Sequence, residues 1–241
     1  MKHRTVRGRI RYTSEKPGKE GAERGREWFA FTHHEDGSII MRAQCEIEEP
    51  DPTVLRDIVY HIGPDMVPRN LLVHLTLGDE FLGSGWMRHE VDANAIECES
   101  YGPGIGRNRE RKEGVGSFDG FGTHPIVGDG FLTRAMDTAK GPHKRTLRVF
   151  LPSPDHRGAT APQIAEHAIT LEYVGEEQKS CAAGSFACHH FRFVDDAGDG
   201  MGGKTHPDYD MWVTADADSI FVYGAIDGYM LNRYELVELE R

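Results

Sequence analysis

Apolar and polar side chains alternate along most of this chain with a period of two, the spacing of a β-strand with one buried face. The clearest stretch alternates Ile39, Met41, Ala43, Cys45 and Ile47 with mostly charged neighbours. An Asp-Gly pair just before it supplies the positive φ that a tight hairpin turn requires. The pattern therefore predicts an antiparallel hairpin in the first quarter of the chain.

The same alternation recurs in segments separated by short turns rich in Gly, Asp and Asn. We expect about eleven strands, from twelve candidate segments: residues 27–33, 38–48, 54–62, 70–77, 81–90, 93–101, 145–151, 165–174, 183–194, 208–214, 219–225 and 229–239. Consecutive strands with short connections form an antiparallel meander, and a sheet of this length avoids exposed edges by curling. The predicted fold is mainly β, a meander curled into a barrel or half-barrel.

Two stretches interrupt the meander. Residues 102–122 contain seven glycines and show no apolar periodicity at their start. The segment 124–139 that follows has the composition of a short helix, and we interpret the two together as a lid or plug for the barrel. Residues 195–206 are also glycine-rich, which indicates a flexible connection between two strands.

The charge of the chain is unevenly distributed. Its 241 residues hold 28 Lys plus Arg and 39 Asp plus Glu, for a formal net charge of −11. Residues 1–26 contain nine Lys or Arg and three Glu and so carry +6, which leaves −17 on the other 215 residues. We interpret residues 1–26 as a basic N-terminal arm that lies on the acidic body or on a neighbouring subunit. Residues 27–241 are predicted to form a single β-barrel domain.

Composition also limits which partners the protein is expected to bind and in which compartment it is expected to work. An acidic body is a poor binder of nucleic acid, and no apolar run of about 18 residues is present, so we expect neither nucleic-acid binding nor a membrane span. The N-terminus lacks the apolar stretch of a signal peptide, and the four cysteines are scattered, which favours a reduced, cytoplasmic protein. A barrel with an edge and a charged arm favours a homodimer. The sequence contains no dinucleotide-binding or phosphate-loop motif, and we expect no cofactor.

Histidine is abundant, with thirteen residues, and it is the side chain best suited to moving protons near neutral pH. His124 precedes Pro125, and Asp129 lies between two glycines, so the two side chains are predicted to form an acid/base pair on constrained backbone at a cavity mouth. In the alternative interpretation both residues brace the short helix. Phe131, in the same segment, is a candidate contact for a hydrophobic substrate.

A second group of candidates lies on neighbouring strands of the C-terminal half. His190 could move a proton and Asp210 could orient it, while Tyr234 or Arg42 would stabilise developing negative charge. The alternative is that Asp210 forms a cross-strand ion pair on the outer wall. The candidate substrate contacts on strands are His74, Trp86 and Trp212.

Three segments carry a resemblance to a known group of proteins. Residues 81–88 read Phe-Leu-Gly-Ser-Gly-Trp-Met-Arg, residues 122–130 read Gly-Thr-His-Pro-Ile-Val-Gly-Asp-Gly, and residues 228–236 read Gly-Tyr-Met-Leu-Asn-Arg-Tyr-Glu-Leu. With the long alternating strands, they resemble a group of uncharacterised bacterial proteins that are similar to lipoprotein carriers and lipocalin-type enzymes. The resemblance covers most of residues 27–241 and implies a cavity for a hydrophobic molecule rather than a particular reaction. Those carriers are exported, whereas this chain shows no export signal.

Three functions follow as hypotheses. The first is a cofactor-independent lyase, hydratase or isomerase that acts by acid/base catalysis on a hydrophobic or aromatic small molecule inside the barrel. The second is a non-catalytic protein that binds a lipid-like or aromatic ligand, which an entirely apolar cavity would favour. The third is a metal-dependent enzyme, for which Cys188, His189 and His190 are the nearest approach to a zinc site, but we assign no metal ligands.

Overall fold

The computed structural model describes residues 2–155, 157–195 and 205–241, and these form one sheet of 15 strands. The strands are β1 (Arg4–Ser14), β2 (Glu23–His33), β3 (Ile39–Ile47), β4 (Val54–Ile62), β5 (Pro68–Leu77), β6 (Glu80–Glu90), β7 (Ala95–Gly102), β8 (Gly106–Glu113), β9 (Gly120–Phe121), β10 (His143–Leu151), β11 (Ala165–Cys181), β12 (Gly184–Val194), β13 (Tyr209–Thr214), β14 (Phe221–Ile226) and β15 (Asn232–Glu240). The helical elements are α1 (Ile126–Leu132) and two 3₁₀ turns, η1 (Thr133–Ala135) and η2 (Thr138–Lys140). Most of the connection predicted at 195–206 lies outside the described residues.

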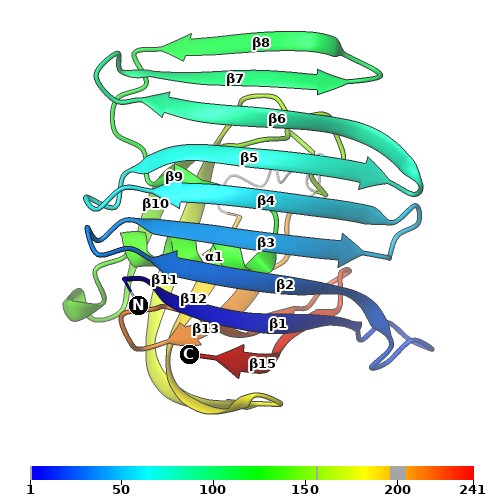
Figure 1. Ribbon diagram of the computed structural model, residues 1–241. Coiled ribbons are helices and arrows are strands. Elements are labelled where there is room, and N and C mark those ends of the chain that lie inside the picture. The colour runs from blue at the N-terminus through cyan, green and yellow to red at the C-terminus, as the bar shows by residue number, and fades with distance from the viewer. Residues whose placement is uncertain (1, 156, 196–204) are drawn as a thin grey trace.

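The sheet follows chain order, with one join between its two halves. β1 to β8 are consecutive antiparallel neighbours and form the broad front layer in Figure 1. β1 also pairs with β15, so β15 to β10 continue the same sheet behind that layer. The two edges are β8 and the short β9, which pairs in parallel with β10. Because no ladder joins β8 to β9 in the described chain, the sheet is a half-barrel, which confirms the predicted mainly β meander.

The short helix lies inside the curl of the sheet. Figure 1 shows α1 between the front layer and the strands behind it. The ring of Phe131, on α1, stacks on Phe31 of β2 with centroids 5.5 Å apart. Ile126 and Val127 of α1 are buried in the same core. The predicted helix is confirmed, and its inner position makes it a plug rather than a lid. Among the described residues no helix is long and apolar enough to cross a membrane.

The interpretation of residues 1–26 as an arm outside the sheet is wrong. They form β1, which is paired on both sides, and the beginning of β2, within which the boundary after residue 26 falls. The basic side chains of β1 meet acidic side chains of β15, with Arg9–Glu238 at 2.8 Å and Arg11–Glu235 at 2.7 Å. The charge imbalance along the sequence is therefore a cross-strand complementarity within one sheet.

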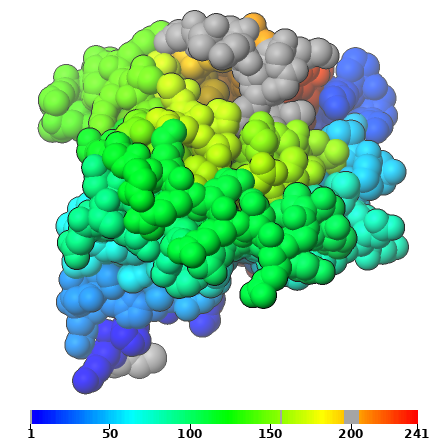
Figure 2. Space-filling model, turned by 90° about the horizontal axis from the view of Figure 1, so that it is seen from above, coloured from blue at the N-terminus to red at the C-terminus, as the bar shows by residue number. Residues whose placement is uncertain are grey.

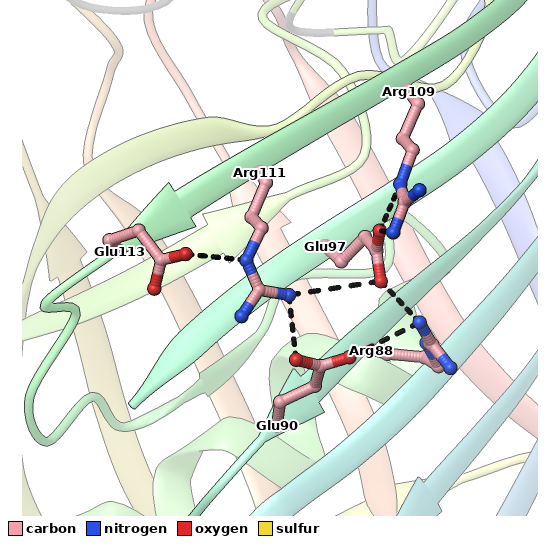
Figure 3. Close-up of polar contacts among 6 residues, drawn as sticks. All are labelled: Arg88, Glu90, Glu97, Arg109, Arg111 and Glu113. Atoms are coloured by element: carbon pink, nitrogen blue, oxygen red, sulfur yellow. Dashed lines mark hydrogen bonds and ion pairs between the residues drawn. The ribbon is translucent and has the colours of Figure 1, made fainter. Parts of the chain in front are cut away.

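The glycine-rich stretch also contains a strand that the pattern did not predict. Nearly every residue of β8 is polar or charged, because an edge strand exposes its side chains and carries no apolar alternation. The carboxylate of Glu97, on the outer face of β7, is 1% exposed and forms ion pairs with Arg88, Arg109 and Arg111 (Figure 3). Hydrogen bonds from Arg88 and Arg109 hold the pKa of Glu97 below its ordinary value against the opposing effect of desolvation. This network attaches β8 to the two preceding strands.

Side chains close the gap that the backbone ladder leaves open. Lys112 of β8 forms an ion pair with Glu166 of β11 at 2.5 Å, and the amide of Ile164 donates to Glu110 of β8 at 2.7 Å. Figure 2 shows the yellow-green segment before β11 directly beside the green strands of the other edge. The described strands and this segment therefore enclose an interior.

Candidate functional site

The described residues line two prominent hollows, one inside the curled sheet and one on its outer surface. The inner cavity has a volume of about 490 Å³, which suits a ligand of drug size. The outer groove measures about 760 Å³ and is open along one side. Because the inner cavity is more enclosed and is lined by buried ionisable side chains, it is the candidate functional site.

The inner cavity combines apolar walls with a polar cluster. The apolar lining includes Ile47, Leu132, Leu151, Ile169, Leu171 and Met211. The polar cluster, which we call the acid–tyrosine cluster, consists of Tyr12, Glu27, Asp129, Tyr209 and Tyr234. Edge-to-face contacts of Tyr234 with Tyr12 at 5.0 Å and with Tyr209 at 5.9 Å hold the three phenols together.

Glu27 is the fixed member of the cluster. Its carboxylate lies on the inner face of β2, fully buried, and accepts hydrogen bonds from the Tyr12 hydroxyl at 2.5 Å and from the amides of Ile126 at 2.7 Å and Val127 at 3.1 Å. Burial raises the pKa of Glu27 to about 7, although these hydrogen bonds and the charge of Arg56 act in the opposite direction. Glu27 therefore anchors the beginning of α1 to β2.

Asp129 is a member of the cluster that is available to a ligand. It is half-buried, and its exposed part lines the cavity. No described residue donates a hydrogen bond to its carboxyl group. Burial and the neighbouring Glu27 raise the pKa of Asp129 to about 8, so at neutral pH this carboxyl group is largely protonated.

The two glycines that flank Asp129 have a packing role. A Cβ atom at Gly128 would overlap the hydroxyl of Thr123, and a Cβ at Gly130 would lie 3.0 Å from the Cβ of Phe221 on β14. Only glycine allows the helix to approach its neighbours this closely. The Gly-Asp-Gly sequence therefore brings α1 against the wall and carries Asp129 to the cavity.

Two further polar atoms at the cavity lack partners. The hydroxyl of Tyr209 and the Oδ1 atom of Asn232 are buried and have no hydrogen-bond partner among the described residues. Both residues line the cavity, where the amide nitrogen of Asn232 donates to the Tyr234 hydroxyl at 3.5 Å. Buried polar groups are almost always hydrogen-bonded, so these atoms are placed to contact a molecule in the cavity.

His124 lines the same cavity on strained backbone. Its φ is 67°, in the left-handed region that non-glycine residues seldom occupy, and it directly precedes Pro125. Its imidazole packs against Gly158, where a Cβ would lie 2.6 Å from the histidine Cδ2. The structure therefore places His124 at the cavity, on left-handed backbone rather than the extended backbone that a residue before proline favours, and its role in catalysis stays a prediction.

Comparisons with known proteins address the fold. No protein-family model matches the chain, and no curated protein matches it in sequence. Among solved structures it is similar to a β-barrel-like protein of the domain of unknown function DUF1849 from Brucella abortus, with a TM-score of 0.58 and 14% identity over 98% of this chain and 97% of that one. The likeness is one of fold.

Two other solved structures align over most of the chain at lower similarity. They are a candidate lipoprotein from Parabacteroides distasonis and a candidate exported protein with a YmcC-like fold from Bacteroides fragilis. They cover 98% of this chain and 94% and 95% of their own, at 9% and 8% identity and with a TM-score of 0.34 in both cases. Of these three solved structures, the Brucella abortus protein supports the β-barrel-like fold.

Three of the ten candidate residues meet at the inner cavity: His124, Asp129 and Tyr234. Phe131 does not line the cavity. It packs in the core against Phe31 and Tyr60, because it lies on a different face of α1 from Asp129.

His190, Asp210 and Trp212 come together as predicted, but on the outer face of β12 and β13. The Nε2 atom of His190 lies 2.7 Å from Asp210, and its ring stacks on Trp212 with centroids 4.3 Å apart. The alternating residues Phe191 and Met211 face the interior instead. The cavity role proposed for this group is therefore wrong, and the outer-wall alternative is correct.

The remaining three candidates also lie outside the cavity. Arg42 is exposed on β3 and donates to the Thr32 hydroxyl at 3.2 Å. His74 and Trp86 line the outer groove, where His74 Nδ1 lies 2.7 Å from the Ser84 hydroxyl. The alternation of strand residues identified which side chains share a face, but not which face is the inner one.

Two buried charges of the interior, Glu27 and Arg56, were not predicted from the sequence. Direct cross-strand pairing places Cys45 between them, and both side chains are fully buried. The available signal was a charged residue at an inward position, since Glu27 shares a face with Phe29 and Phe31. A charge in such a position requires partners and so indicates a functional or structural polar site.

The described residues do not form a metal site. Within the described ranges, no group of three His, Cys, Asp or Glu side chains is arranged to hold a metal ion. Cys188 and His190 share the outer face of β12, while His189 points inward to the Tyr173 hydroxyl at 3.1 Å.

Proposed function

We propose that this protein binds a small amphipathic molecule in the inner cavity. The apolar body of the ligand contacts the walls, and its polar group contacts the acid–tyrosine cluster. The observation that carries the proposal is that Asp129, the Tyr209 hydroxyl and Asn232 Oδ1 face one apolar-walled cavity without partners among the described residues. The resemblance to half-barrels that hold hydrophobic molecules supports it.

The polar cluster offers both kinds of hydrogen-bonding atom. Asn232 Oδ1 accepts, the Tyr209 hydroxyl donates or accepts, and the protonated carboxyl of Asp129 does both. The ligand therefore carries a hydroxyl, carbonyl or amine group at one end of an apolar or aromatic body.

All four cysteines are free thiols, in keeping with the reduced, cytoplasmic setting that we also propose.

Fluorescence titration with N-phenyl-1-naphthylamine, an apolar aromatic probe with one N–H group, tests the binding proposal. We expect saturable binding at one site per chain. Ile169→Trp fills the cavity and should weaken binding at least tenfold, because the ring occupies the space of the probe. Val174→Trp is the matched control, since Val174 is exposed on the same strand and does not line the cavity. Equal binding by the two variants, or no saturable binding by the wild type, would contradict the proposal.

A second candidate function is acid/base catalysis on the bound molecule. The cavity is not entirely apolar, and the pKa of Asp129, raised to about 8 by burial and Glu27, is close to the value that general acid/base catalysis favours at neutral pH. In this function Asp129 transfers the proton, and the hydroxyls of Tyr209 and Tyr234 donate hydrogen bonds to developing negative charge. Glu27 holds the helix and does not touch the substrate.

The ring opening of 5-nitrobenzisoxazole tests the catalytic candidate. The carboxylate of Asp129 would take the proton from the ring carbon, the C–H electron pair would form the nitrile, and the N–O bond would break to release a phenolate. We expect a rate about 100-fold above that of Asp129→Asn, rising with pH to a plateau above pH 8. Asp210→Asn, on the outer face, should retain the wild-type rate. A rate unchanged in Asp129→Asn would rule out this assignment of the base.

A further inference from the structure

The outer groove is a second hollow, separate from the inner cavity. It lies on the outer face of β4 to β8, and three large side chains in it are exposed: Leu72 by 44%, Trp86 by 37% and Tyr101 by 52%. Trp86 and Tyr101 are on adjacent antiparallel strands at diagonal positions, because Trp86 pairs with Glu99 and Tyr101 with Ser84. Large aromatic side chains gathered on a hollow surface indicate an interaction site.

The aromatic rings are held in place before any ligand arrives. Tyr101 stacks on Phe81 at 6.2 Å, and Phe81 stacks on His74 at 5.2 Å. The guanidinium of Arg88 lies 4.7 Å from the centre of the Trp86 ring, and Glu97 holds that arginine in the network of Figure 3. Rings that are already fixed lose little conformational entropy on binding.

The polar lining of the groove is balanced in charge. It contains the carboxylates of Asp57 and Glu99 and the guanidiniums of Arg107 and Arg109. Glu99 and Arg107 form no hydrogen bond or ion pair with another described side chain, so one acceptor group and one donor group are available beside the rings. An ionic ligand would meet as much repulsion as attraction here, whereas a neutral ligand rich in hydroxyl groups uses both.

We propose that the outer groove binds a neutral glycan. The C–H faces of sugar rings pack on Trp86 and Tyr101, while sugar hydroxyls donate to Glu99 and accept from Arg107. An open groove that crosses several strands accommodates an extended chain of sugar units, unlike the enclosed inner cavity. The unpaired donor and acceptor favour a hydroxylated ligand over a lipid, which would leave them unsatisfied.

Native gel electrophoresis of the full chain, in gels that contain laminarin, dextran, glucomannan or hydroxyethylcellulose, tests this proposal. We expect at least one of these neutral polysaccharides to retard the wild type. Trp86→Ala and Tyr101→Ala should each weaken that binding at least tenfold. Trp28→Ala is the matched control, because Trp28 is 39% exposed on the same sheet and does not line the groove.

Other results would overturn the assignment. Migration unaffected by all four polysaccharides would contradict binding of a neutral glycan. Retardation that persists in the Trp86→Ala, Tyr101→Ala double variant would show that the glycan binds outside the groove. Sedimentation velocity provides a separate readout: self-association that the double variant abolishes would show that a second copy of the chain covers the groove. Binding to phosphatidylcholine vesicles, lost in the double variant, would show a lipid surface instead. None of these results depends on the inner cavity.

Discussion

Glu27→Ala is expected to destabilise the fold by about 3–5 kcal/mol, because it leaves three buried donors without their acceptor. Those donors are the Tyr12 hydroxyl and the amides of Ile126 and Val127. The substitution also removes the negative charge that acts on the buried Arg56 guanidinium from the other side of β3. Urea unfolding followed by tryptophan fluorescence measures the loss, and hydrogen exchange should show the greatest loss of protection at the beginning of α1.

Glu27→Gln provides the control for this substitution. Glutamine keeps the volume of the side chain and one acceptor oxygen, so we expect a loss of only about 1 kcal/mol. If both variants lost the same stability, the hydrogen bonds to Glu27 would not be what holds α1 against β2. If Glu27→Ala does not fold, the hydrogen-exchange pattern of Glu27→Gln still tests the anchoring role.

The stability of the wild-type protein is expected to fall as the pH rises from about 5 to about 8. The pKa of Asp129 is about 8 in the folded state, against an ordinary value of 3.8, and the pKa of Glu27 is about 7, against an ordinary value of 4.5. Between these limits the folded state holds protons that the unfolded chain has released, so each higher pH favours unfolding. The free energy of unfolding falls by about 1 kcal/mol per pH unit for each group, between its pKa in the unfolded chain and its pKa in the folded state. Urea midpoints measured across this range record it.

Asp129→Asn removes the larger part of this dependence. Asparagine stays neutral at every pH, so the variant should be at least about 2 kcal/mol more stable than the wild type at pH 9. Asp210→Asn is expected to behave oppositely. Partial burial opposes ionisation of Asp210, yet hydrogen bonds from His190 and Arg192 hold its pKa below the ordinary value, so its loss destabilises the protein at neutral pH. A wild type whose stability rises between pH 5 and pH 8 would contradict the raised pKa of Asp129.

Several features of the fold were predictable because they depend on local pattern. The alternation in β3, the short helix at α1 and the positions of most strands follow from the side-chain periodicity of two or from turn residues. The sequence did not predict β1 and β8, because their charged residues mask the alternation of apolar and polar positions. In β1 the charges pair with β15, more than 200 positions away, and in β8 the strand is an edge with little to bury. The proposed homodimer stays a prediction.

The candidate site depended on information that the sequence does not contain. Gly-Asp-Gly and the His-Pro pair marked the segment that reaches the cavity, and this local signal was correct for Asp129 and His124. His190 and Asp210 were correctly grouped, because alternation places residues i and i+2 on one face of a strand. Their position outside the cavity was decided by the direction in which the sheet curls.

The sequence by itself determined that this chain forms a long antiparallel meander with a short helix at its centre, because strand periodicity and turn chemistry act between near neighbours. Only the tertiary structure decided that the meander curls with Tyr209 and Met211 inward, that β1 joins the two halves, and that Glu27 meets α1 some 100 positions further along. The physical reason is that curling brings distant strands together. The burial that raises the pKa of Glu27 and Asp129 exists only once those strands have met.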